Sequence, residues 1–190
     1  MSFLTRLAER CDAVTNAKDK GRLSMPICTG NTASGKPLKV PRLARADGDT
    51  HRYHVSEREN YSAVRAHYHS NGKAKRKSVI VGGENNHNVK VLPEDYATEA
   101  EARAAAQAEF TRTQRSQATL DYSLARGKAD LFPETPVTVS GFKPEIDETG
   151  WLVKKATHRI GNDGFVTDLE LEMRDDPTTA RHRSHFRKAK

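Results

Sequence analysis

The chain has 190 residues, of which 35% are hydrophobic and 30% charged, with a net charge of +7 and a mean hydropathy of −0.80. This length is enough for one full domain and an incomplete second one, and the composition predicts a modest core with long polar loops or tails. No apolar run is long enough to span a bilayer, and charged residues interrupt the first ten positions, which excludes a signal peptide. We therefore expect a soluble protein.

The N-terminal part of the chain predicts a helix, a short strand and a linker. Phe3, Leu4 and Leu7 fall near one face of the helix, and the apolar stretch 23–28 follows as a strand. Residues 30–41 are rich in Gly, Ser, Thr and Pro, a composition typical of a linker.

This part contains one segment that resembles a nucleotide-binding motif, and it also contains both cysteines of the chain. Residues 30–36 fit the pattern G-x-x-x-x-G-K of a phosphate-binding loop, but Pro37 stands where Ser or Thr would ligate magnesium. Cys11 and Cys28 are the only cysteines, and neither has a second Cys or a His at ligand spacing. We expect no nucleotide site, no zinc site and two reduced thiols.

The next segment predicts strands joined by turns. Asp47-Gly48-Asp49 is a turn signal that leads into a strand over 51–55. A second strand is expected over 61–69, because apolar and polar residues alternate there. Asn71-Gly72 closes it, and residues 78–81 form its partner strand.

The clearest helix is expected from Glu99 to Arg115. Thr98 and Glu101 form a capping box at its start, and Glu99 with Arg103 makes an i,i+4 pair. An alanine face buries little area, so this helix should lie close against a sheet. The apolar stripe at helical spacing consists of Ala97, Ala100, Ala104, Ala105 and Ala108.

Four further strands follow the helix, over 119–124, 137–140, 151–160 and 165–174, with a turn at 161–164 before the last one. Period-2 alternation implies one buried face and one wet face, as in an antiparallel sheet or small barrel. The fold class is therefore α+β, an antiparallel β-barrel or sandwich with one packed helix. Five apolar side chains should be largely buried: Trp151, Phe165, Leu169, Leu171 and Met173.

No constellation of catalytic residues is recognisable. Gly-x-Ser-x-Gly and His-Glu-x-x-His are absent, and no pair of carboxylates stands out. The pairs His51 with His54 and His67 with His69 each lack a third ligand at a recognisable spacing. We predict that the protein is not an enzyme, with no catalytic, cofactor-binding or metal-binding residue.

Basic residues concentrate near the C-terminal end, after a strand terminator at 175–179. This segment has no hydrophobic period, so we expect it to be a flexible tail. It offers candidate contacts for a polyanion or a partner protein, namely Arg181, Arg183, Arg187, Lys188 and Lys190.

Several segments together resemble one known family. Residues 136–147, 151–153 and 164–172 closely resemble the C-terminal end of the phage late control D family, tail proteins of contractile-tailed temperate phages. Phe3-Leu4-Thr5-Arg6-Leu7-Ala8-Glu9 is similar to a motif from the middle of that family, and residues 58–64 are also similar. The resemblance covers nearly the whole chain, and its motifs are structural.

The resemblance implies a baseplate hub, similar to the hub part of the type VI secretion spike protein. Such a protein forms a homotrimer with two tail-tube-like barrels per chain and joins the sixfold tube to the threefold spike. The implied partners are tube, spike and baseplate proteins, and the implied location is the virion tail, after synthesis in the bacterial host cytoplasm. The alternative is a basic nucleic-acid-binding or late gene expression control protein, which we do not favour.

The resemblance also implies a domain organisation. Residues 1–45 would be a remnant of a preceding hub domain, 46–175 a tail-tube-like barrel domain, and 176–190 the flexible basic tail. Members of the family usually carry a substantial N-terminal half with the first barrel, so the chain looks like a truncated product, an internal-start product or a cloned fragment.

Overall fold

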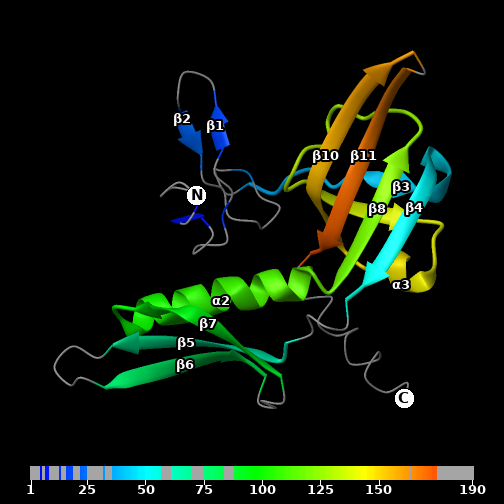
Figure 1. Cartoon of the computed structure of the whole chain (residues 1–190). Helices are drawn as coiled ribbons and strands as arrows, with labels where there is room; N and C mark the ends of the chain where they lie inside the picture. The colour runs from blue at the N-terminus through cyan, green and yellow to red at the C-terminus, as the bar shows by residue number, and fades with distance from the viewer. Residues whose placement is uncertain are drawn as a thin grey trace. The chain divides into compact units, whose positions relative to one another are not determined.

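The chain divides into two compact units, which are described separately. The computed structural model, drawn in Figure 1, describes residues 5, 7–8, 13, 16–18, 22–24, 32, 36–56, 61–69, 75–83, 88–162 and 164–174. One unit comprises residues 1–28 and 56–114, and the other comprises residues 29–55 and 115–190. The range 46–175, expected to form a single barrel, is thus shared between the two units, because residues 56–114 belong to the first one.

The first unit contains a three-stranded sheet and the main helix. Strand β5 lies in the centre, antiparallel to β6 and parallel to β7. The hairpin of β5 and β6 was predicted, but β7 was not, because Pro93 and two acidic residues weaken its strand pattern. The bounds are β1 Asn16–Lys18, β2 Arg22–Ser24, β5 Ala63–His69, β6 Arg76–Gly82, β7 Val89–Tyr96 and α2 Glu99–Arg115.

Helix α2 begins and ends where the sequence predicts. The backbone N–H of Glu101 donates to Thr98 Oγ1 at 3.2 Å, which satisfies one of the free amides of the first turn. Arg103 Nη2 lies 3.1 Å from Glu99 Oε1, so the expected i,i+4 ion pair is also present. Local signals therefore defined this helix correctly.

The buried face of α2 differs from the predicted stripe. Ala105 and Ala108 are buried as predicted, and Ala102 and Ala106 are buried as well, whereas Ala97, Ala100 and Ala104 are exposed. The expected close approach to a sheet is confirmed, because small side chains let the helix lie near the strands. The helix packs on a cluster of buried residues from all three strands, namely Val64, Ala66, Tyr68, Val79 and Tyr96.

The second unit is a six-stranded sheet in the order β3-β9-β10-β11-β8-β4. All neighbours are antiparallel except β3 and β9, which are parallel. The predicted α+β class with an antiparallel β-barrel or sandwich is confirmed. Strand β3 was not predicted, because it lies next to the linker. The bounds are β3 Arg42–Ala44, β4 Gly48–Val55, β8 Ala118–Leu124, β9 Pro136–Ser140, β10 Trp151–Gly161 and β11 Gly164–Met173.

The six-stranded sheet curls into a half-barrel, as Figure 1 shows. Its two outermost strands, β3 and β4, follow each other in the chain and are joined only by the short 3-10 helix η2, Arg45–Asp47. The Tyr122 hydroxyl on β8 donates to the carbonyl of Ala44 at 2.6 Å, which ties this corner to the sheet. Gly48 is required beside it, because a Cβ there would lie 2.2 Å from the carbonyl oxygen of Ser123.

Large side chains fill the concave face of this sheet. Trp151, Leu169 and Leu171 are buried as predicted, whereas Phe165 and Met173 are half-buried. Thr167 lies on the same face of β11 and is fully buried, which the alternation of apolar residues did not reveal. The remaining buried members are Leu43, Ala118, Leu120, Tyr122, Leu124, Leu131, Val137, Val139, Ile146 and Val153.

The connection from β9 to β10 covers part of this core. Its short helix α3, Pro144–Asp147, is held by the indole Nε1 of Trp151, which donates to the carbonyl of Ile146 at 2.9 Å. The ring of Phe142 meets His51 of β4 edge-on at 5.1 Å and Tyr122 of β8 at 5.4 Å. This connection therefore joins β4 and β8 to the other end of the sheet.

No helix within the described ranges is both long and apolar enough to cross a membrane.

Candidate assembly surface

The convex face of the six-stranded sheet carries charges in rows across four strands. In one row Lys155 of β10 lies opposite Glu170 of β11, which lies opposite Asp121 of β8, which lies opposite Arg52 of β4. Residues in register point to the same face, so these four side chains are neighbours. The two carboxylates, Glu170 and Asp121, lie opposite each other on the inner strands, and each has a cation opposite it on its outer side.

Ion pairs connect the strands of this face. Lys155 Nζ lies 2.9 Å from Glu170 Oε1, and Arg159 of β10 pairs with Asp168 of β11. The hydroxyl of Ser123 on β8 donates to Asp168 Oδ1 at 2.7 Å. Each exposed pair contributes little to stability. Because charged and polar side chains cover the convex face of the six-stranded sheet, this face carries no large apolar patch among its described residues.

One ion pair of this unit is buried. Arg115 Nε lies 2.9 Å from Glu172 Oε1, and the two side chains are only 5% and 13% exposed. Removing one member of such a pair leaves an uncompensated charge with little access to water. The pair fixes the chain where it enters β8 beside the end of β11.

The hairpin of β10 and β11 extends beyond its neighbours, as Figure 1 shows. β10 pairs with β9 only at Trp151 and Leu152, and the pairing of β11 with β8 stops where Thr167 meets Leu124. The core face continues along the free part of the hairpin and ends at Ile160, which is 85% exposed. Single exposed apolar side chains are common on protein surfaces, so it is the projecting position of Ile160 that makes it a candidate contact for another protein.

A chain of hydrogen bonds fastens the neighbouring loop to this hairpin. The N–H of Lys128 donates to Thr167 Oγ1 at 3.1 Å, and Thr167 Oγ1 lies 2.9 Å from Nδ1 of His158. Nε2 of His158 lies 3.1 Å from the carbonyl oxygen of Leu131. Because a carbonyl only accepts, Nε2 is the donor to Leu131, and in the neutral imidazole Nδ1 then accepts from the threonine hydroxyl. The loop thereby holds Phe132, 49% exposed, beside the hairpin.

The other end of this loop is anchored at the corner between β3 and β4. Asp47 accepts a hydrogen bond from the N–H of Ala44 at 3.2 Å, and Lys128 Nζ lies 3.2 Å from the same oxygen. Both interactions favour the ionised carboxylate, so they lower the pKa of Asp47 below its usual range. The N–H of Ala125 also donates to the carbonyl of Asp47 at 3.0 Å.

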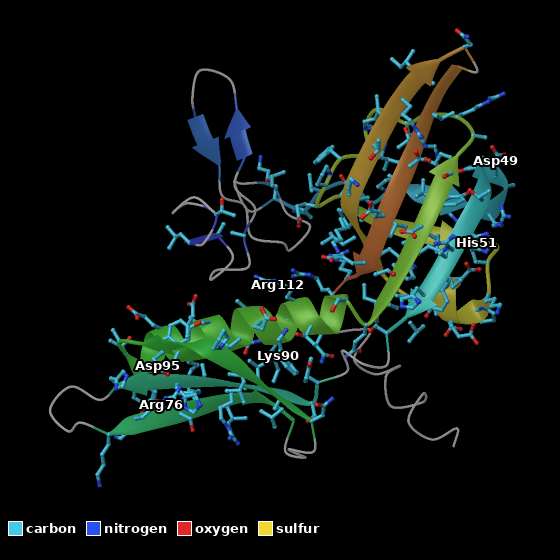
Figure 2. All side chains as sticks on the ribbon, viewed as in Figure 1. Asp49, His51, Arg76, Lys90, Asp95 and Arg112 are labelled. Atoms are coloured by element: carbon cyan, nitrogen blue, oxygen red, sulfur yellow. The ribbon has the colours of Figure 1, made fainter. Side chains whose placement is uncertain are left out.

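Two of the histidines predicted to be ordinary polar residues contact an aromatic ring or a carboxylate. His51 contacts the ring of Phe142, and His69 Nε2 lies 3.5 Å from Asp95 Oδ2. Figure 2 labels His51, which lies on β4, and Asp95, which lies on β7 and is the neighbour of His69. Across the described residues, no three His, Cys, Asp or Glu side chains are grouped so as to hold a metal ion.

Several predicted features lie outside the described residues. These include the basic tail with Arg181, Arg183, Arg187, Lys188 and Lys190, both cysteines, and most of the motif over 30–36. Within that motif, the N–H of Thr32 donates to the carbonyl of Lys36 at 2.8 Å.

The sequence did not single out Ile160 and Phe132, the two exposed apolar residues of the hairpin and its loop. A signal for Ile160 was available: it is the last residue before the turn at Gly161-Asn162-Asp163-Gly164, where a polar residue is usual. Phe132 has no comparable signal, because a single aromatic residue in a loop is as often buried as exposed.

The comparisons with known proteins identify the family. The model of the family described as phage tail baseplate hub (GPD) matches residues 1–164. The chain belongs to this family. Proteins named probable baseplate hub protein, from Escherichia phage 186 and Escherichia phage P2, are 38% and 37% identical to it over 212 and 211 residues. These alignments cover 90% of this chain and 54% of each relative, so the chain spans about half the length of the relatives it matches.

Solved structures of two tail proteins and of a virion chain share the fold of this hub-family chain. The 43 kDa tail protein of prophage MuSo2 from Shewanella oneidensis has a TM-score of 0.63 and 17% identity, covering 88% of this chain and 52% of its own. A tail protein from Neisseria meningitidis MC58 has a TM-score of 0.62 and 14% identity, covering 89% and 52%. A chain of the gene transfer agent virion has a TM-score of 0.55 and 16% identity, covering 92% and 38%. The predicted resemblance to tail hub proteins is confirmed.

Proposed function

We propose that this chain is a structural part of the baseplate hub of a phage or prophage tail, an adaptor between tail tube and spike that acts by assembly and not by catalysis. Its partners would be other tail proteins, and its location the virion tail after synthesis in the host cytoplasm. The longer protein of the family would form the homotrimer. Membership of the hub family is the observation that carries this proposal.

The half-barrel supports an assembly role. Its convex face is polar and its charges are paired between strands, so it does not require a hydrophobic cover. The most exposed of the large apolar residues described in this unit is Ile160 at the hairpin tip, and it would meet another tail protein together with the neighbouring loop residue Phe132. The alternative of a nucleic-acid-binding or late control protein rests on the basic tail, 181–190, and has no further support.

A genetic experiment tests the hub role. Deleting the gene in the phage or prophage that encodes this sequence should abolish infectivity and leave particles without complete tails in electron micrographs. Intact, infectious particles after deletion would contradict the proposal. The variant Ile160→Asp should fold normally and lower the yield of complete tails more than about tenfold, because a charge replaces an apolar anchor. Val40→Asp, at another exposed apolar position of the same unit, is the matched control.

A further inference from the structure

Strand β6 has one free edge. β6 pairs with β5 along its whole length, from Gly82 opposite Ala63 to Arg76 opposite His69. Among the described strands, none pairs with its other side. A free edge presents a row of backbone N–H and C=O groups that can pair with a further strand.

The opposite edge of the same sheet is protected in three ways. On β7, Pro93 has no N–H to donate, and the register with β5 shifts between Arg65 and His67. Acidic side chains, Glu94 and Asp95, follow the proline. β6 has no proline and no register shift. β6 shares only the third device, since it carries Arg76 and Lys77, and these cations still admit a strand with carboxylates opposite them. The contrast with β7 therefore indicates that β6 is kept open for an acidic partner strand.

The side chains of β6 indicate what would pair with it. Lys75, Arg76 and Lys77 are consecutive exposed cations at its start. Arg76 reaches Asp95 at 2.7 Å, and Figure 2 shows these two side chains on the three-stranded sheet. The second half of the strand is apolar, with Ile80 41% exposed on the face that α2 does not cover.

We propose that the free edge of β6 binds an extended segment of another protein by strand addition. In the antiparallel orientation, which is slightly the more stable, an apolar β-branched beginning of the segment lies opposite residues 79–81. An acidic end of the segment then lies opposite residues 75–77. A second copy of β6 is disfavoured as the partner, because the strand contains no carboxylate to neutralise these cations. The inference does not depend on the hub role.

The probe for this surface is a fluorescein-labelled peptide, Thr-Val-Thr-Val-Glu-Glu-Glu, titrated with the whole chain and followed by fluorescence anisotropy. We expect saturable binding with a dissociation constant near or below about 1 mM. The reversed peptide, Glu-Glu-Glu-Val-Thr-Val-Thr, and hexaglutamate should bind more weakly. Amide hydrogen exchange across Arg76–Gly82 should slow when the first peptide is bound, while exchange across Val89–Tyr96 should not change.

Variants locate the binding edge. The double change Lys75→Glu with Lys77→Glu should weaken the peptide about fivefold, since exposed ion pairs are lost. Ile80→Thr should weaken it about threefold by removing apolar contact. The matched control is Val91→Thr, because Val91 is 50% exposed on the protected edge and faces the same side as Ile80. It should leave binding unchanged.

The proposal is overturned by any of three results. The first is the absence of saturable binding and of slowed exchange at β6. The second is equal binding of the reversed peptide or of hexaglutamate, which would indicate attraction of charge without strand pairing. The third is an equal loss of binding in Ile80→Thr and Val91→Thr. All variants are surface changes, and unchanged thermal melts would verify that they fold.

Discussion

The two units of this chain are stabilised by different kinds of side chain. The half-barrel has one continuous core of large residues, among them Trp151, Tyr122 and Leu171. The smaller sheet packs against α2 through alanines such as Ala102 and Ala106. Large side chains remove much apolar area from water, whereas alanines contribute mainly by letting backbones approach. The core of the half-barrel therefore depends on large side chains that fill its volume. The contact of α2 with the smaller sheet depends on small side chains on the helix.

The units also differ in whether the outermost strands of their sheets are covered or free. The half-barrel brings its outer strands together at η2 and packs Phe142 between His51 and Tyr122. The three-stranded sheet has one blocked edge, at β7, and one free edge, at β6. The comparison suggests that the half-barrel provides the stable frame and the smaller sheet a pairing surface.

The largest effect should follow from emptying the half-barrel core. Trp151→Ala removes the largest fully buried side chain and its bond to the carbonyl of Ile146, so it should lower the free energy of unfolding by about 3–5 kcal/mol. Denaturant melts followed by far-UV circular dichroism measure the change. Lys155→Ala, on the convex face of the same strand, should stay within about 0.5 kcal/mol. Equal losses in both variants would show that the inner and outer faces are wrongly assigned.

A smaller effect should follow from overfilling the helix contact in the other unit. Ala106→Leu introduces extra volume where α2 lies close to the sheet and should cost about 1–3 kcal/mol. Ala104→Leu is the matched control, because Ala104 lies exposed on the same helix and leucine is also a good helix former. Hydrogen exchange of residues 61–69 and 99–115 would report the loss. A tolerated leucine at position 106 would mean that the alanine face is not closely packed.

The smallest effect is expected from removing the smaller sheet altogether. Val55 of β4 and Ala118 of β8 are paired, so the chain leaves and re-enters the half-barrel at neighbouring positions. Replacing residues 57–114 by Asn-Gly in a chain of residues 29–190 should keep the half-barrel folded, with a melting temperature lowered by less than about 5 °C. Trp151 is the only tryptophan, so its fluorescence reports on this unit alone. Loss of cooperative unfolding would show that the half-barrel needs the inserted residues.

Local patterns in the sequence were sufficient for individual elements. Thr98 and Glu101 placed the start of α2 correctly, because a cap is a contact between residues three apart. Alternation identified the buried faces of β8 and β9, and the turn at 161–164 identified the hairpin of β10 and β11. The family resemblance was carried by the same strands.

Other features escaped the sequence. Thr167 can be buried because its hydroxyl is hydrogen-bonded to Lys128 and His158. A pattern of alternating apolar residues does not predict such hydrogen bonds. β7 contains Pro93, which argues against a strand unless that strand lies at an edge. The buried stripe of α2 is centred on Ala102 and Ala106, and the choice between neighbouring alanine stripes depends on where the sheet lies.

What the sequence by itself determined is therefore most of the strands of the half-barrel, the hairpin of β5 and β6, the bounds of α2 and the family. Only the tertiary structure decided which strands pair across long stretches of chain, such as β4 with β8 and β3 with β9. It also decided that α2 covers the three-stranded sheet and that the outer edge of β6 stays free. The physical reason is range: caps, turns and alternation depend on residues a few positions apart, whereas the pairing of distant strands depends on contacts that no local pattern encodes.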